Sequence, residues 1–292
     1  MFASTAGYLV DRVTQRWVQF TGKEVDFAKD TWLQGPIGEP HCIGTDYFHE
    51  LARKQFLQVR PGTGLLDDFD RLKALDFDPS AVTIEVSDFY EKTAYYEMDA
   101  WSEWCCVFRP FGTLLALIFS RRLQQLNIPL SSLETSRGLT SEILELVDPR
   151  TGHVQMTAWL RRLLGNGNVL YAGAYSTCRV PNYQGECVKV VFPLPNGNAM
   201  VIMRPVAHAD GSFSLVSHGE RFGDPGFYFT VHSTRGVHAR YLRSLRESIR
   251  IYSAEQETVR ADHVLTLWGL TFLKLHYRLR KKGPRTSRFA LA

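Results

Sequence analysis

The chain has 292 residues, of which 45% are hydrophobic and 22% are charged, and its formal net charge is +4 at pH 7. These values exclude a disordered chain, a collagen-like fibre and a coiled coil. The length fits roughly two average domains, or one large β domain with a helical extension. The composition is that of an ordinary globular protein and indicates no particular function.

Cysteine usage argues against a disulfide framework. The cysteines are odd in number, two are adjacent, and no C-x-x-C pair is present for a zinc ribbon or a thioredoxin-like redox site. We therefore predict no disulfide, no bound transition metal and no cofactor. The cysteines are Cys42, Cys105, Cys106, Cys178 and Cys187.

The sequence contains no recognisable targeting or membrane-spanning segment. The first residues lack the basic stretch and apolar run of a signal peptide. The longest apolar run, from Phe111 to Phe119, is about half the length that crosses a bilayer. These features predict a cytoplasmic protein without a membrane span.

Residues 1–137 are expected to be mostly helical or irregular. Apolar residues recur at helical spacing from Thr45 to Gln58, and a second helix is expected from Asp78 to Tyr96. A third helix, nearly apolar on all sides, is predicted from Phe111 to Leu126.

From Leu139 onward the hydrophobic pattern alternates with a period of two, and turn signals separate the runs. Short strands without helices between them predict an antiparallel region. Asn196-Gly197 is the strongest hairpin signal in the chain. The predicted strands are Ser141–Val147, His153–Trp159, Val169–Thr177, Cys187–Phe192, Ala199–Arg204, Ser212–Ser217, Phe227–His232, Val237–Leu242, Ser248–Ser253, Arg260–Trp268 and Thr271–Tyr277.

Together these elements predict an α+β protein. Residues 1–137 would pack on a predominantly antiparallel β-barrel of residues 138–280, followed by a basic flexible tail of residues 281–292. A closed up-and-down barrel of the lipocalin or calycin kind hides both edge strands, and we expect it first. A β-sandwich is one alternative, and a helix-grip fold is another because Leu267 to Leu279 also fits a helical spacing.

The common catalytic and phosphate-binding motifs are missing. The sequence has no P-loop, no complete dinucleotide fingerprint, no G-x-S-x-G elbow and no H-E-x-x-H. His232 and His238 flank the turn at Arg235-Gly236, but spacing supplies no third metal ligand. An exposed hairpin explains these two histidines without a metal.

Positive charge concentrates near the C-terminus, where we expect a strand end and a solvated tail. The alternative is a contact with nucleic acid or anionic lipid. No RNA-binding signature or zinc-finger spacing supports nucleic acid, so we predict none as a partner. The residues concerned are Lys274, Arg278, Arg280, Lys281, Lys282, Arg285 and Arg288.

Alternation places four polar residues among apolar neighbours, as ligand sites require: Tyr175, Arg204, His263 and Tyr277. Of these, His263 is the candidate general acid or base, because the pKa of an unperturbed histidine is about 6.5. Tyr277 or Arg204 would stabilise developing negative charge. The competing interpretations are a hydrogen-bonded core histidine and an arginine that pairs with a carboxylate at the rim.

Aromatic residues suggest the rest of the site. Tyr171, Gly173 and Tyr175 share one strand face, which suits either a packed corner or a ligand slot. Tyr175 is the predicted ligand-binding residue of this group. Trp101 and Trp104 are predicted to form a lid, because flat aromatic side chains cover a cavity mouth with little loss of rotamer entropy.

Several short segments carry a resemblance to known sequences. They are Asp88–Thr93, Trp101–Trp104, Arg121–Leu126, Phe192–Asn198, Phe222–Tyr228 and Leu275–Arg278. In these segments the chain resembles an uncharacterised family of actinobacterial hypothetical proteins, over most of its length from about residue 30. The resemblance implies a bacterial protein of a single unit. The family has no assigned activity, so no functional residue is carried over.

Three functions are consistent with these features. The first is binding of an apolar or aromatic small molecule in a β-barrel cavity, lidded by the N-terminal helices. The second is a cofactor-independent enzyme, such as a cyclase, isomerase or hydratase, on the same scaffold. The third is a structural or partner-binding protein that docks through Phe111–Phe119.

Overall fold

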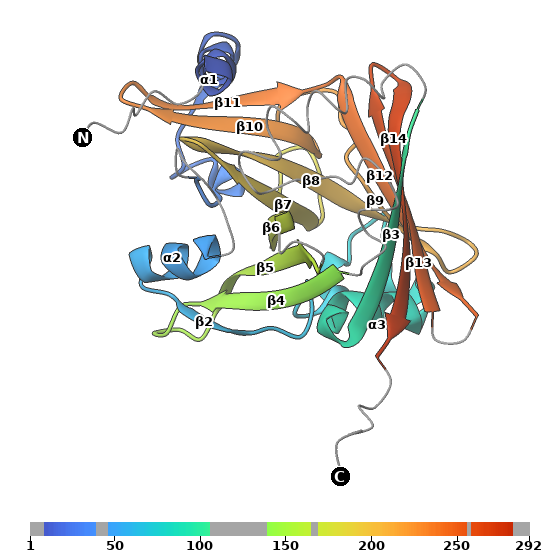
Figure 1. Cartoon of the computed structure of the whole chain (residues 1–292). Coiled ribbons are helices and arrows are strands. Elements are labelled where there is room, and N and C mark those ends of the chain that lie inside the picture. The colour runs from blue at the N-terminus through green and yellow to red at the C-terminus, as the bar shows by residue number, and fades with distance from the viewer. Residues whose placement is uncertain (1–8, 39–45, 106–138, 165–168, 256–257, 283–292) are drawn as a thin grey trace.

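A computed structural model describes residues 9–38, 46–105, 139–164, 169–255 and 258–282, and antiparallel strands make up most of its regular structure (Figure 1). The helices are α1 (Leu9–Thr21), α2 (Tyr47–Lys54) and α3 (Ile84–Glu91), with 3-10 turns η1 (Thr31–Leu33), η2 (Phe69–Leu72), η3 (Pro79–Ala81) and η4 (Thr93–Tyr95). The strands are β1 (Lys23–Val25), β2 (Gln58–Pro61), β3 (Tyr96–Trp104), β4 (Leu139–Val147), β5 (Val154–Leu163), β6 (Val169–Cys178), β7 (Cys187–Leu194), β8 (Gly197–Ala207), β9 (Phe213–Val216), β10 (Gly226–Ser233), β11 (Gly236–Leu242), β12 (Leu245–Ala254), β13 (Thr258–Leu267) and β14 (Leu270–Lys281).

All these strands belong to one branched sheet whose strand-to-strand ladders are antiparallel. The central strands run in the order β2-β4-β5-β6-β7-β8. At β8 the sheet divides: residues 197–202 pair with β10, and residues 204–207 pair with β9. We call β10, β11 and β1 the short arm, and β9, β12, β13, β14 and β3 the long arm.

The expected closed barrel is not formed by the strands that the structure describes. β2 and β3 end the path of paired strands, and no ladder between described residues joins them. The sheet does not close because it branches at β8: the C-terminal strands are divided between two arms and do not continue around one ring. The coarser expectation of a mostly antiparallel β protein is confirmed.

The strands expected after Leu139 are all present, with ends that differ by a few residues. Asn196-Gly197 does join β7 to β8, and Asn196 adopts a left-handed φ of 59°. Residues 270–281 form β14 along the whole of β13, so the helix required by the helix-grip alternative is absent there.

The N-terminal expectations are only partly met. α2 lies within the helix expected from Thr45, whereas the helix expected from Asp78 to Tyr96 is divided into η3, the shorter α3 and η4. β1, β2 and β3 were not predicted, and each pairs with a strand from beyond residue 138. The helix expected at residues 111–126, with the proposed docking segment inside it, lies outside the described residues.

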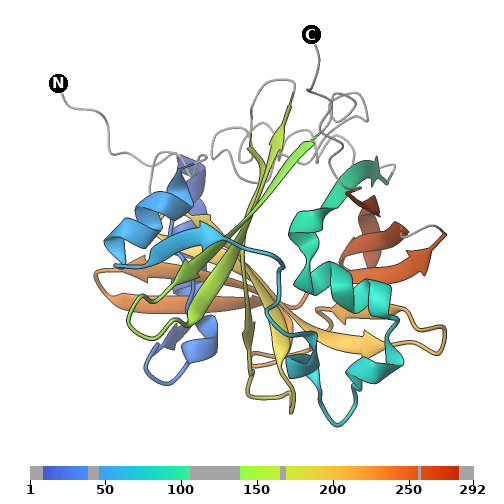
Figure 2. The same cartoon turned by 90° about the horizontal axis from the view of Figure 1, so that it is seen from below.

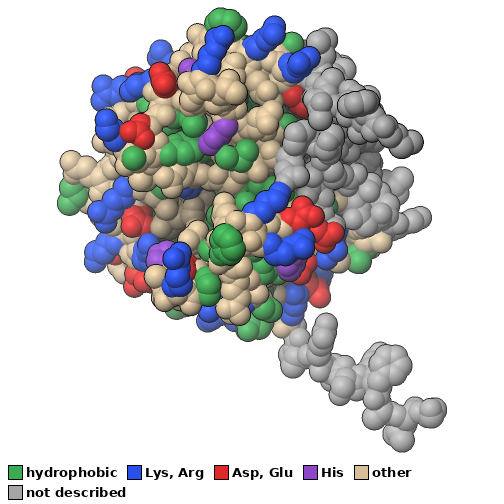
Figure 3. All heavy atoms as spheres, turned by 90° about the vertical axis from the view of Figure 1, so that its left-hand side faces the viewer, with side chains coloured by type: hydrophobic (Ala, Val, Ile, Leu, Met, Phe, Trp, Pro, Cys, Tyr) green, Lys and Arg blue, Asp and Glu red, His purple; other side chains and the backbone are tan. Residues whose placement is uncertain are grey.

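The basic residues at the end of β14 pair with acidic residues of neighbouring elements. Arg278 Nη2 lies 2.7 Å from Asp99 Oδ2 on β3, and Lys281 Nζ lies 3.1 Å from Asp88 Oδ2 on α3. These ion pairs therefore link β14 to β3 and to α3. On another face of the molecule, Lys and Arg side chains are interspersed with Asp and Glu (Figure 3).

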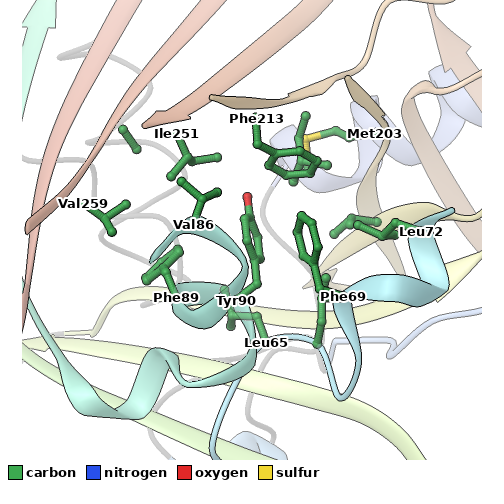
Figure 4. Packing of buried hydrophobic residues seen from close by; sticks show 14 of the residues in the cluster. Leu65, Phe69, Leu72, Val86, Phe89, Tyr90, Met203, Phe213, Ile251 and Val259 are labelled. Atoms are coloured by element: carbon green, nitrogen blue, oxygen red, sulfur yellow. The ribbon is translucent and has the colours of Figure 1, made fainter. Parts of the chain in front are cut away.

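Apolar side chains cover both faces of the central strands. In β8, Met200 and Ile202 join a core with α2 and η1, whereas Val201 and Met203 join a second core with η2 and α3. The two helices α2 and α3 accordingly lie on opposite sides of β4 and β5 (Figure 2). In the second core, aromatic rings from η2, α3 and β9 pack together (Figure 4). This double coverage buries most residues of β5, β7 and β8.

Replacing Gly197 by Ala should disrupt the pairing of β8 with the short arm. A Cβ atom at Gly197 would lie 1.9 Å from the carbonyl oxygen of Thr230 on β10, so the backbone must shift. We expect a loss of about 3 kcal/mol or more in the free energy of unfolding, measured by urea denaturation.

Gly152→Ala is the matched control, because Gly152 has a φ of +70° but open space around its Cβ position. Its cost should be about 1 kcal/mol, from backbone strain alone. Equal losses in the two variants would contradict the close approach at β8.

Candidate functional site

A cavity of about 300 Å³ lies between the central strands and the two arms. Strands β5 to β8 line one side, β10 and α3 contribute further residues, and β12, β13, β14 and β3 line the other side. Most of the described lining residues are apolar. The polar ones are Arg161, Glu247, His263, Ser102 and four tyrosines, Tyr90, Tyr171, Tyr175 and Tyr277.

Strand alternation explains why Glu247, His263 and Tyr277 of the long arm face the cavity. In β12 the residues at odd positions face the cavity, so Glu247 lies between Leu245 and Ile249 on that face. His263 is directly opposite Ile249 in the register, one diagonal step from Glu247. Tyr277 pairs with Ala261 and is therefore a diagonal neighbour of His263 on the other side.

Glu247 and His263 form a polar pair at this wall. His263 Nε2 lies 3.3 Å from Glu247 Oε2, with the two side chains 15% and 7% exposed. Ser217 fixes the backbone of Glu247, because its Oγ accepts a 2.8 Å hydrogen bond from the Glu247 N–H. The rings of His263 and Tyr277 are stacked at 6.4 Å between centroids. A histidine oriented by a carboxylate is an arrangement that general acid–base chemistry uses.

The opposite wall carries a buried cation. Arg161 on β5 is 7% exposed, and its guanidinium carbon lies 3.4 Å from the centroid of the Trp159 ring. The same carbon is 4.8 Å from the ring of Tyr171 and 5.7 Å from that of Tyr277. Its Nε is buried and has no hydrogen-bond partner among the described residues. Aromatic faces thus stabilise a charge that no described carboxylate approaches within 4 Å.

Gly173 explains how two tyrosines share one face of β6. A Cβ atom there would lie 2.8 Å from the hydroxyl of Tyr171, so the missing side chain leaves room for the Tyr171 ring. That ring reaches along the strand, and its hydroxyl lies 2.7 Å from the hydroxyl of Tyr175. Tyr171 itself fills the space beside Gly173, so this space is not an empty ligand slot. Both phenols line the cavity.

Burial keeps these phenols in their neutral form. Desolvation raises the pKa of Tyr175 to about 12, against the opposing effect of the Arg161 charge. It also raises the pKa of Tyr171 and of Tyr277, and Arg161 opposes the shift in both cases. At neutral pH the cavity therefore presents phenol hydroxyl groups beside the Arg161 guanidinium.

Four of the six predicted site residues line this cavity: Tyr175, His263, Tyr277 and Trp101. Trp101 is 42% exposed and lies at the edge of the cavity. Their proposed roles stay predictions, because a position alone does not establish a role.

Arg204 and Trp104 do not line the cavity. The Arg204 side chain is 36% exposed and lies 3.6 Å from Asp76, which matches the competing interpretation of a rim arginine. It shares a strand face with Met200 and Ile202, and that face of β8 packs toward α2 rather than toward the cavity. Trp104 packs instead on Phe272, with 6.3 Å between ring centroids.

Two cavity residues, Arg161 and Glu247, are not among the residues predicted from the sequence. Glu247 had a usable signal, because it alternates with Ile249 and Ile251 on the apolar face of β12. Arg161 had none, since residues 157–161 of β5 are all buried and alternation cannot assign them to a face.

The histidines near the β10–β11 turn are not directly opposite each other. His232 pairs with Val237, and His238 pairs with Val231. Within the described part of the chain, no group of three or more His, Cys, Asp or Glu side chains gathers as a metal site. The absence of a metal stays a prediction.

Because the phenols are buried, we expect the free energy of unfolding to fall at alkaline pH. The unfolded chain loses its tyrosine protons near pH 10, whereas folded Tyr175 keeps its proton to about pH 12. Stability must therefore fall as the pH rises from about 10 to about 12, because the unfolded state binds fewer protons in that window. Urea denaturation at several pH values measures this slope.

Tyr175→Phe should flatten the slope, because the substitution removes one of the phenols that the folded state keeps protonated. Tyr95→Phe is the control, since Tyr95 is 54% exposed. Equal slopes in wild-type protein and Tyr175→Phe would mean that Tyr175 ionises as freely in the folded state as in the unfolded chain.

Comparison with known proteins gives one informative similarity. No protein-family profile matches the sequence, and no solved structure matches it. The chain is 28% identical over 219 residues to the uncharacterized membrane protein YndJ of Bacillus subtilis (strain 168). The aligned part covers 74% of this chain and 38% of that protein.

This similarity contradicts the predicted cytoplasmic location, because the matched protein is named a membrane protein. Within the described residues, no helix combines the length and the apolarity that a bilayer span needs. The chain resembles a part of a larger protein whose own activity is not characterised. The resemblance to actinobacterial sequences stays a prediction.

Proposed function

We propose that the protein binds an apolar or aromatic small molecule in the cavity between the central strands and the two arms. The observation that carries this proposal is the lining: a few polar groups at fixed positions in an otherwise apolar wall. Ligand sites have this composition, and their volumes start at about 300 Å³. The curved, branched sheet would then serve as the container that a lipocalin-like barrel provides in other proteins.

Aromatic residues support this choice of ligand. Trp159, Phe192, Phe227 and Phe229 join the tyrosines in the lining, from β5, β7 and β10. Their rings offer large contact areas at little conformational cost. Trp101 lines the cavity and is 42% exposed, and this position supports the proposed lid role.

Catalysis in the same cavity is a second candidate function, and the Glu247–His263 pair favours it. The imidazole nitrogen and the carboxylate oxygen are 3.3 Å apart at the cavity wall. With Tyr277 as its neighbour, His263 would transfer a proton to or from a bound molecule without a cofactor. A binding protein needs no such pair, so turnover that depends on His263 would distinguish the two functions.

We also propose a membrane-associated location in place of the cytoplasmic one. The similarity to a protein named a membrane protein supports this location. Membranes are rich in apolar molecules of the kind that the proposed cavity takes. Fractionation of the source cells is the direct check.

Filling the cavity should abolish binding of an apolar probe. Ala199 on β8 lines the cavity, and a phenylalanine at this position would occupy part of its volume. We expect wild-type protein to bind the neutral dye Nile red with an increase in fluorescence, and Ala199→Phe to bind it at least about tenfold more weakly. This factor corresponds to about 1.4 kcal/mol.

Ala254→Phe adds the same side chain to β12 at a position that does not line the cavity, and it should leave the affinity for Nile red unchanged. Circular dichroism is the check that both variants fold. Equal affinity in all three proteins would place dye binding outside the cavity and would contradict the proposal.

A further inference from the structure

We propose that the natural ligand is an apolar molecule with a single carboxylate, which pairs with Arg161. This inference rests on the proposed function and adds the chemical class of the ligand. It begins from the one buried cation in the described cavity lining. Arg161 is 93% buried, because its exposed fraction is 7%, and its Nε has no hydrogen-bond partner among the described residues.

A buried charge without a counter-charge is costly, so its presence needs a reason. Transfer of a charged group from water into an apolar site is strongly unfavourable unless a counter-charge or hydrogen bonds compensate. Contact with the rings of Trp159 and Tyr171 and a hydrogen bond to the Tyr277 hydroxyl compensate in part, but they supply no counter-charge. A ligand carboxylate would supply the missing counter-charge and an acceptor for the guanidinium N–H groups.

The neighbouring groups fit the carboxylate as well. The phenols of Tyr171 and Tyr175 meet at 2.7 Å, so one of the two hydroxyls donates to the other and the other keeps its proton for a ligand oxygen. Tyr277 lies 5.7 Å from the Arg161 guanidinium carbon, measured to its ring centroid. The Arg161 cation and these neutral phenols together form a surface that favours an anion.

Glu247 is the group that opposes an anion, and its position limits the charge that the cavity accepts. Its carboxylate lies beside His263 at 3.3 Å rather than beside Arg161. A monoanion balances Arg161 alone, whereas a doubly charged phosphate would leave an excess negative charge in an apolar cavity that already holds Glu247. The geometry therefore favours a carboxylate over a phosphate ester.

Competition between two ligands of equal chain length tests this inference. Decanoate and decan-1-ol are each titrated against Nile red bound to the full-length protein at pH 7.5, where an alkyl carboxylate is ionised. We expect decanoate to displace the dye about 10- to 100-fold more effectively than the alcohol, the range for a hydrogen bond to a charged group. Equal displacement by both ligands would overturn the inference and leave the proposed function intact.

Variants at Arg161 assign the preference to that side chain. Arg161→Met and Arg161→Gln should bind decanoate about 10-fold or more weakly, with little change for decan-1-ol. Arg162→Gln is the control, because Arg162 is the next residue on β5 and pairs with Glu142 outside the cavity lining. A preference for decanoate that persists in both Arg161 variants would overturn the assignment.

Two further readouts distinguish a ligand-binding arginine from a purely structural one. Unliganded Arg161→Met should be as stable as wild-type protein or more stable, whereas a purely structural arginine would cost stability when replaced. Glu247→Gln should strengthen decanoate binding by removal of a negative charge.

If neither decanoate nor decan-1-ol displaces bound Nile red, the inference fails. If Nile red itself does not bind, the proposed function fails with it.

Discussion

Strand β8 offers one edge to two different strands, and the position of the cavity depends on this division. Its first half pairs with β10, its second half pairs with β9, and Met203 lies between the two ladders. The arms that begin at these ladders separate from each other, and both contribute residues to the cavity lining, such as Phe229 of the short arm and Ile249 of the long arm. A sheet that continued on one side only would have left this space open or would have closed it as a barrel.

The electrostatics of the cavity follow from its apolar surroundings. Arg161 and Glu247 lie on opposite walls, each held by local contacts, the first by aromatic rings and the second by His263. Low polarity strengthens each remaining interaction, because few water dipoles screen the charges. It also keeps the tyrosines neutral, as the raised pKa of Tyr175 shows. An apolar container with a few fixed polar groups is thus a consequence of the same burial that forms the fold.

Much of the β structure could be predicted from sequence because alternation and turn residues are local signals. The Asn196-Gly197 hairpin and the faces of His263 and Tyr277 were found in this way. The branch at β8 could not be predicted, since the choice of partner for one strand edge depends on residues distant in the sequence. β3 was missed because acidic residues interrupt its aromatic ones, and Arg204 was assigned to the wrong side because both faces of β8 are apolar.

A crystal structure with a bromine-labelled acid would show where the carboxylate and the apolar end of a ligand lie. Protein crystallised with 10-bromodecanoate carries an anomalous scatterer at the apolar end of the ligand. We expect the carboxylate within hydrogen-bond distance of the Arg161 guanidinium, and the bromine in the cavity among the leucines of β14, such as Leu273 and Leu275. A bromine peak beside Arg161, or a ligand bound only outside the cavity, would contradict this expectation.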